Sequence, residues 1–166
     1  MTTPTHLSFG YIIAYQMLRS GLLPQELHHS IITVSMIAST LPDLDTLAVW
    51  KAMRHRQNSP FHYPLFWIFI ISGTAAFFSI TDQRLYLIYT LIAGINIFLH
   101  LILDTFSLNE GIKWFFPFNK REYNFLKVPK AESAAILVQR TLVHPMTKIE
   151  AAIWAIALIV RIKSNI

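Results

Sequence analysis

Two long apolar segments separated by a short polar turn constrain the fold more than any other feature of this chain. The first runs from residue 63 to residue 80 without a charged side chain, and the second runs from residue 85 to residue 103. The turn between them is Thr81-Asp82-Gln83-Arg84. A helix of about 20 apolar residues crosses a bilayer, and a short connection places two helices side by side and antiparallel. The sequence therefore predicts a transmembrane helical hairpin.

Shorter apolar segments on both sides of the hairpin predict further helices. These cover residues 7–19, 25–41, 134–143 and 149–162. Gly21 is a stop signal for the first of them, and Pro42 ends the second. Residues 105–130 are aromatic and basic and contain glycine and prolines, which is typical of an irregular loop. We expect an all-α fold, a membrane-associated helical bundle in a single domain over residues 1–166.

The composition agrees with a membrane environment. Hydrophobic residues make up 54% of the 166 residues, charged residues make up 14%, and the mean hydropathy is +0.45. A net charge of +5 by itself could indicate nucleic acid, but the basic residues mostly flank apolar segments or lie between residues 113 and 130. Basic residues beside hydrophobic spans anchor the cytoplasmic side. We therefore expect a multi-pass membrane protein that contacts lipid rather than nucleic acid, with the open ends of the hairpin in the cytoplasm.

Histidine and aspartate side chains lie at the ends of the apolar segments, where they are costly unless they pair, titrate or bind a cation. They are His6, Asp43, Asp45, His62, His100 and Asp104. In an up-and-down bundle the first helix begins where the second ends and the third begins where the fourth ends, which brings all six to one end. His100 and Asp104 are four residues apart and share one helix face. The chain has no cysteine, so thiolate-bound zinc and disulfides are excluded.

Imidazole and carboxylate groups without thiolate suit Zn, Mn, Fe or Ni, and such mixed sites are common in phosphoesterases.

Each motif also has an ordinary interpretation that does not involve a metal. An Asp-x-Asp after a helix is a common turn signal, and a His-x-x-x-Asp often forms an internal hydrogen bond. His55 and Arg56, in the basic loop, are either lipid-facing charges or a metal ligand and a phosphate-binding guanidinium. The combination favours a metal site.

Taken in chain order, the motifs are Thr5-His6, Leu41-Pro42-Asp43-Leu44-Asp45, His55-Arg56 followed by His62, His100-x-x-x-Asp104, and Gly111 leading to Phe116-Pro117-Phe118. This order, over residues 5–125, resembles the bacterial membrane-bound metal-dependent hydrolase family. Some members are described as LexA-binding, inner-membrane-associated hydrolases. That family is distantly similar to zinc-dependent phospholipase C and related zinc nucleases, which are all-helical.

The resemblance implies a phospholipase C-like fold in the bacterial inner membrane and hydrolysis of a phosphoester, in particular one in a lipid. It also implies one or two divalent metal ions, with zinc first and Mn or Fe as alternatives. The implied ligands are His6, Asp43 or Asp45, His55 or His62, His100 and Asp104. The family often has His-Arg-x-x-Thr-His-Ser, whereas in this chain His62 follows His55 at a longer spacing, so both histidines stay candidates.

In the mechanism we expect, the metal activates a water molecule, Asp45 accepts its proton, and Arg56 stabilises the developing phosphoryl charge. Two other functions are compatible with the sequence. One is a non-catalytic membrane scaffold with a structural metal site, whose basic cytoplasmic face binds a protein partner. The other is a small transporter with a polar pathway through Asp43, Asp45, His100 and Asn96.

Overall fold

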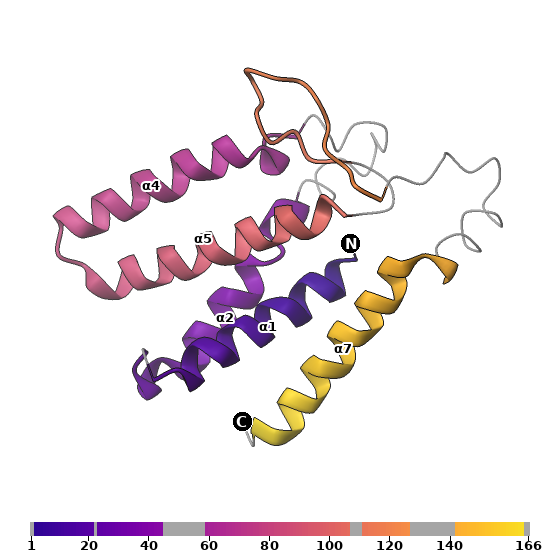
Figure 1. Ribbon diagram of the computed structural model, residues 1–166. Helices are drawn as coiled ribbons and strands as arrows, with labels where there is room; N and C mark the ends of the chain where they lie inside the picture. Colours follow the sequence, from indigo (N-terminus) through magenta and orange to yellow (C-terminus); the bar gives the residue numbers. More distant parts are fainter. Residues whose placement is uncertain (1, 22, 45–58, 107–110, 127–141, 165–166) are drawn as a thin grey trace.

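The computed structural model describes residues 2–21, 23–44, 59–106, 111–126 and 142–164. Its α-helices are α1 (Thr3–Arg19), α2 (His28–Ala38), α4 (Pro64–Ile80), α5 (Arg84–Asp104) and α7 (Pro145–Ser164). Short 3-10 turns are η1 (Gln25–Leu27), η2 (Leu41–Asp43) and η4 (Pro60–His62). Within these residues β-structure is limited to one isolated bridge between Ile112 and Tyr123. The all-α prediction is confirmed (Figure 1). Most of the helix predicted at residues 134–143 lies outside the described residues.

Helices α4 and α5 form the predicted antiparallel hairpin (Figure 1). The chain reverses at Asp82, whose φ of 52° lies in the left-handed region that aspartate tolerates. Among the described residues, α5 is the one helix long and apolar enough to cross a membrane, with 21 residues and a mean hydropathy of 2.0. Helix α4 is also apolar but is shorter, with 17 residues. It begins one residue later than the apolar run because Tyr63 is extended and Pro64 is suited to the first helical position.

Helix α1 begins earlier than the apolar pattern predicts, because Pro4 lies in its first turn, where a missing N–H costs nothing. It ends as predicted, with Gly21 at a φ of 71°. The second predicted helix is divided into η1, α2 and η2, and Pro42 lies inside η2 instead of ending α2. The Ser39 and Thr40 hydroxyls bond the carbonyls of Met36 and Ile37, which favours a turn here.

Helices α1 and α2 approach closely at Gly10. A Cβ atom there would lie 2.6 Å from Ser39 Oγ and 2.8 Å from the Ser35 carbonyl oxygen. The Ser35 hydroxyl donates to the Gly10 carbonyl at 2.8 Å across the same contact. The side chain of Ser35 is fully buried. This crossing holds the end of α2 and the start of α1 together, one turn from His6.

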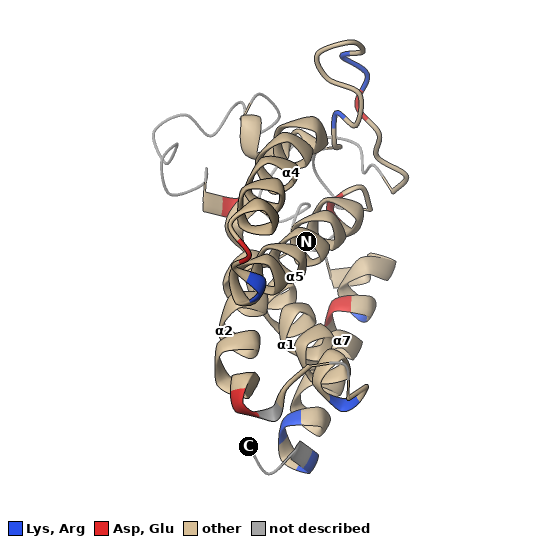
Figure 2. Cartoon of the chain, turned by 90° about the vertical axis from the view of Figure 1, so that its left-hand side faces the viewer, with Lys and Arg blue, Asp and Glu red and all other residues tan. Residues whose placement is uncertain are grey.

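The apolar core has two parts, one at each end of the bundle. The first consists of Ala38, Trp67, Ile97, Leu101 and Ile112. The second consists of Ala14, Leu18, Ile31 and Ile92. Many large apolar side chains of α4, α5 and α7 point outward instead, Phe69 and Ile80 among them. The charged residues gather near helix ends and in the connecting loops (Figure 2), and this distribution suits a lipid environment around the hairpin.

Candidate metal centre

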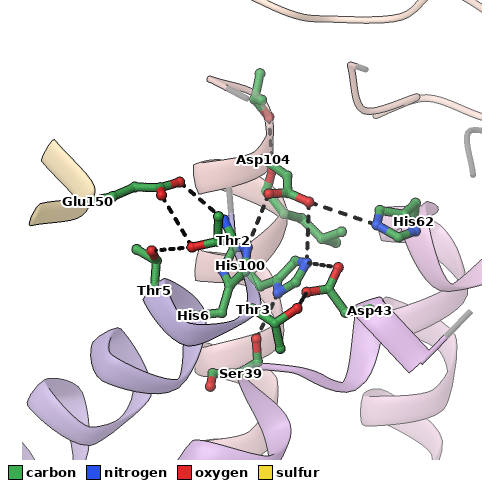
Figure 3. Close-up of polar contacts among 12 residues, drawn as sticks. Thr2, Thr3, Thr5, His6, Ser39, Asp43, His62, His100, Asp104 and Glu150 are labelled. Carbon is green, nitrogen blue, oxygen red and sulfur yellow. Dashed lines mark hydrogen bonds and ion pairs between the residues drawn. The ribbon is translucent and has the colours of Figure 1, made fainter. Parts of the chain in front are cut away.

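Five histidine and aspartate side chains converge at the end of the bundle where α1 begins and α5 ends (Figure 3). They are His6 on α1, Asp43 on η2, His62 on η4, and His100 and Asp104 in the last two turns of α5. None is more than 9% exposed. The convergence follows from the helix directions, since η2 comes after α2 and η4 comes before α4. It agrees with the layout that the sequence predicts.

The orientation of His100 is set by the backbone of the α2 end. Its Nδ1 atom lies 2.7 Å from the Ser39 carbonyl oxygen, which can only accept, so Nδ1 carries a proton and Nε2 is the ring nitrogen that faces the carboxylates. Nε2 has no hydrogen-bond partner among the described residues. It faces Asp104 Oδ2 at 3.4 Å and Asp43 Oδ1 at 3.8 Å. Electron-rich atoms buried face to face require a proton or a cation between them.

Asp104 lies at the centre of the cluster and uses both of its oxygens. Oδ1 is 3.1 Å from His6 Nε2, and Oδ2 faces His100 and is 3.8 Å from His62 Nε2. The His6 ring stacks on the His100 ring with 3.7 Å between centroids. Burial lowers the pKa of His6, although its hydrogen bond to Asp104 opposes the shift. His6 donates a proton from Nε2 to Asp104, because a carboxylate oxygen accepts.

Four of these residues could hold one metal ion: Asp43, His62, His100 and Asp104. Each offers one nitrogen or oxygen atom, and these four atoms all lie within 4.8 Å of one another. In a tetrahedral zinc site with bonds of about 2.1 Å, the ligand atoms are about 3.4 Å apart. The contacts of 3.4 and 3.8 Å around His100 are close to that separation. The donor set therefore fits a first-row divalent cation after a small contraction.

An outer layer of contacts supports the candidate ligands. The Thr3 hydroxyl donates to Asp43 Oδ2 at 3.0 Å, which leaves Oδ1 facing His100. The Ser39 carbonyl fixes the His100 tautomer, as described above. Such partners orient metal ligands and raise metal affinity. Neither was predicted, because a backbone carbonyl has no sequence signature and Thr3 stands next to a proline without any motif.

The structure brings together five of the residues that the sequence proposed as metal ligands. Of these, His6 contacts the group through Asp104 and lies beside the set of four. His62 is in the set. Asp45, His55 and Arg56 lie outside the described residues, so their roles stay predictions.

The fold and the cluster define a class: an all-helical protein with an apolar hairpin and a buried carboxylate and imidazole cluster at its open end. A family model described as YdjM inner membrane protein matches residues 1–164, and the chain belongs to this family. Searches among curated proteins and among solved structures gave no match. The family places the chain with inner-membrane proteins, and the chemistry has to be argued from the cluster itself.

Proposed function

We propose that this protein is a metal-dependent hydrolase of the inner membrane that cleaves a phosphoester bond in a lipid. The observation that supports the proposal most directly is the position of His100 Nε2. This atom is buried, lacks a hydrogen-bond partner among the described residues and faces two carboxylates. A divalent cation would satisfy all three groups at once.

In this proposal Asp43, His62, His100 and Asp104 hold the ion. The ion would lower the pKa of a water molecule toward neutrality and polarise a phosphoryl oxygen. His6 holds Asp104 through Oδ1, and Thr3 holds Asp43 through Oδ2, so both carboxylates keep an oxygen for the ion. Two further roles come from the sequence. We propose that Asp45 accepts the proton of the water molecule and that Arg56 binds the phosphoryl oxygens.

A lipid substrate is supported by the surroundings of the cluster. Next to His62, the Tyr63 ring stacks on Phe116 at 4.2 Å, so the loop of residues 111–126 lies beside the site. This loop exposes Phe115 and Phe118, the latter 89% exposed, close in sequence to exposed Lys120 and Arg121. Exposed aromatic and basic side chains together are typical of the lipid headgroup layer.

The orientation in the membrane is also part of the proposal. We propose that α4 and α5 both cross the bilayer, with α4 near the lower limit of length for a span. The loop at residues 111–126 then lies at the open end of the hairpin, and the turn at Asp82 and Arg84 lies at the other surface. The larger number of basic residues near the open ends supports a position of the cluster on the cytoplasmic side.

The test is metal content and hydrolysis by the full-length protein purified in detergent. We expect at least one equivalent of bound divalent metal by elemental analysis. We expect phosphate-ester cleavage in mixed micelles of anionic phospholipid that a chelator abolishes and zinc restores. His100→Gln should lose both metal and turnover. His29→Gln, which changes an exposed histidine of α2, is the matched control and should retain both. A wild-type protein that contains much less than one equivalent of bound divalent metal would refute the proposal.

A second function is favoured by one observation, the number of protein ligands. Four buried protein donors fill a tetrahedral site, which is the arrangement of structural rather than catalytic zinc. The protein would then be a membrane scaffold with a basic face for a protein partner. Asp45→Asn separates the two functions, because an enzyme would lose turnover while a scaffold would keep both its metal and its partner.

A further inference from the structure

We infer that Glu150 and Trp154 of α7 are positioning residues for the metal centre, and that they act through the first turn of α1. The inference rests on the metal site proposed above. Among the described residues, α7 contributes no atom to the candidate ligand set. It nevertheless runs beside α1 (Figure 1), and two of its side chains bond to Thr2 and Thr5, in the turn that precedes His6.

The contacts on the α7 side involve one face of that helix. Glu150 accepts two hydrogen bonds from Thr2, from the backbone N–H at 3.1 Å and from the hydroxyl at 3.2 Å (Figure 3). One turn further along α7, the Trp154 indole N–H donates to the Thr5 hydroxyl oxygen at 3.0 Å. The Thr2 and Thr5 hydroxyls are 2.8 Å apart and bond to each other. Glu150 thus places a negative charge at the N-terminus of α1, where the helix dipole favours it.

The same turn of α1 contacts the metal centre with its other residues. Thr3 donates to Asp43, and His6 bonds to Asp104. Residues 2 and 5 therefore bond to α7, while residues 3 and 6 support the two carboxylates of the proposed site. Thr5 is fully buried between the two sets of contacts. A displacement of this turn would move both outer supports of the ligands together, and α7 is placed to prevent it.

A structural role alone makes a different prediction from a positioning role. The Glu150 contacts are solvent-exposed, and exposed hydrogen bonds of this kind contribute little to global stability. If Glu150 serves only the docking of α7, its loss should change metal affinity no more than it changes stability. If it positions the ligands, its loss should weaken metal binding while the metal-free protein unfolds at nearly the same temperature.

The experiment measures the zinc affinity of the full-length protein in detergent by competition with a chromogenic chelator, together with the unfolding midpoint of the metal-free protein. Outer supports of metal ligands are worth about 10-fold to 100-fold in affinity, and Glu150 is one contact further away. We expect Glu150→Ala and Trp154→Phe each to lower zinc affinity by about 10-fold, near the bottom of that range. Glu150→Gln keeps an acceptor oxygen, so this variant should retain most of the zinc affinity of the wild type. Glu26→Ala removes an exposed carboxylate from η1 and should have no effect.

Two further measurements make the result decisive. The first is the zinc affinity of the double variant Glu150→Ala with Thr3→Val. Its loss of binding free energy should be smaller than the sum of the two single losses, because both changes act on the same turn. The Thr5 and His6 amides bond to the Thr2 carbonyl, so they should exchange hydrogen faster in Glu150→Ala. Unchanged zinc affinity in Glu150→Ala, or additive losses, would overturn the inference. If the wild type binds no zinc, the proposed function fails, and the exchange of these two amides still decides whether α7 holds the turn.

Discussion

At each end of α5 an aspartate faces a nitrogen-containing side chain, but the two ends lie in opposite environments. At the hairpin turn, Arg84 pairs with Asp82 at 3.3 Å, and the two side chains are 87% and 83% exposed. At the other end, the His100 and Asp104 side chains are 0% and 12% exposed. The exposed pair stays hydrated, so it contributes little to stability. The buried group has lost its water and needs compensation from within the protein. Burial, together with imidazole in place of guanidinium, distinguishes the end that can bind a cation.

The largest difference between the two ends should be seen when an aspartate in each is neutralised. Asp104→Asn removes an anionic oxygen that faces both His62 and His100, so we expect zinc affinity to fall by about 100-fold or more. Asp82→Asn at the exposed end should leave the zinc affinity unchanged. Competition with a chelator measures both variants. Equal affinities would mean that burial does not distinguish the two ends.

Zinc itself should stabilise the buried end. A ligand at 100 times its dissociation constant stabilises the folded state by about 2.7 kcal/mol. We expect the wild type to gain this amount in chemical unfolding followed by circular dichroism, and to lose it again when a chelator is added. Asp43→Asn should show a much smaller gain. A wild type whose unfolding does not respond to zinc would contradict the assignment of the cluster as a metal site.

Packing also distinguishes the helix crossing beside the buried end from the exposed face of α4, and two glycines test it. Gly10→Ala forces a Cβ against Ser35 and Ser39, which should cost about 1–3 kcal/mol of unfolding free energy and disturb His100. Gly73 in α4 has no atom within 4 Å of the position that a Cβ would take. Gly73→Ala should be neutral or stabilise the helix by up to about 1 kcal/mol. Equal effects would show that the crossing of α1 and α2 is loose.

The hydroxyl of Thr3 offers a smaller test of the buried end. Thr3→Val removes the bond to Asp43 with little change of shape, and we expect about a 10-fold loss of zinc affinity. Thr74→Val is the matched control, because the Thr74 hydroxyl bonds only to carbonyls of its own exposed helix turn. Isothermal titration compares the two. An intact affinity in Thr3→Val would remove Thr3 from the support of the site.

The smallest effect is expected at the exposed end itself. Arg84→Gln breaks the ion pair with Asp82 in solvent, so the unfolding free energy should change by no more than about 0.5 kcal/mol. Thermal unfolding at two salt concentrations measures it. A large, salt-dependent loss would show that this pair is more than a hydrated surface contact.

Much of the helix content and the location of the cluster could be predicted from the sequence. The apolar runs predicted α4 and α5 to within one or two residues, because an uninterrupted apolar segment bounded by polar turns is a local signal. The directions of the helices then placed His6, Asp43, His62 and His100 at one end. The apolar pattern missed the first turn of α1, which contains Pro4, and Pro42 misled the prediction of where the second helix ends, since it lies inside η2.

The supporting contacts of the site could not be predicted, because each joins residues far apart in the chain. The Ser39 carbonyl and His100 are 61 positions apart, Thr3 and Asp43 are 40 apart, and Thr2 and Glu150 are 148 apart. The supporting residues Ser39, Thr3, Thr2 and Glu150 belong to no motif. Their pairing depends on how closely α1, α2, α5 and α7 pack.

The sequence by itself determined that this chain forms apolar helices and carries its imidazoles and carboxylates at their ends, because helix formation and hydrophobic patterning are local properties. The tertiary structure decided which atoms face one another. The approach of α1 to α2 at Gly10 and the bond from His100 to the Ser39 carbonyl leave one buried ring nitrogen facing two aspartates. Distances between such atoms depend on helix packing, and a cation site exists only when those distances are short.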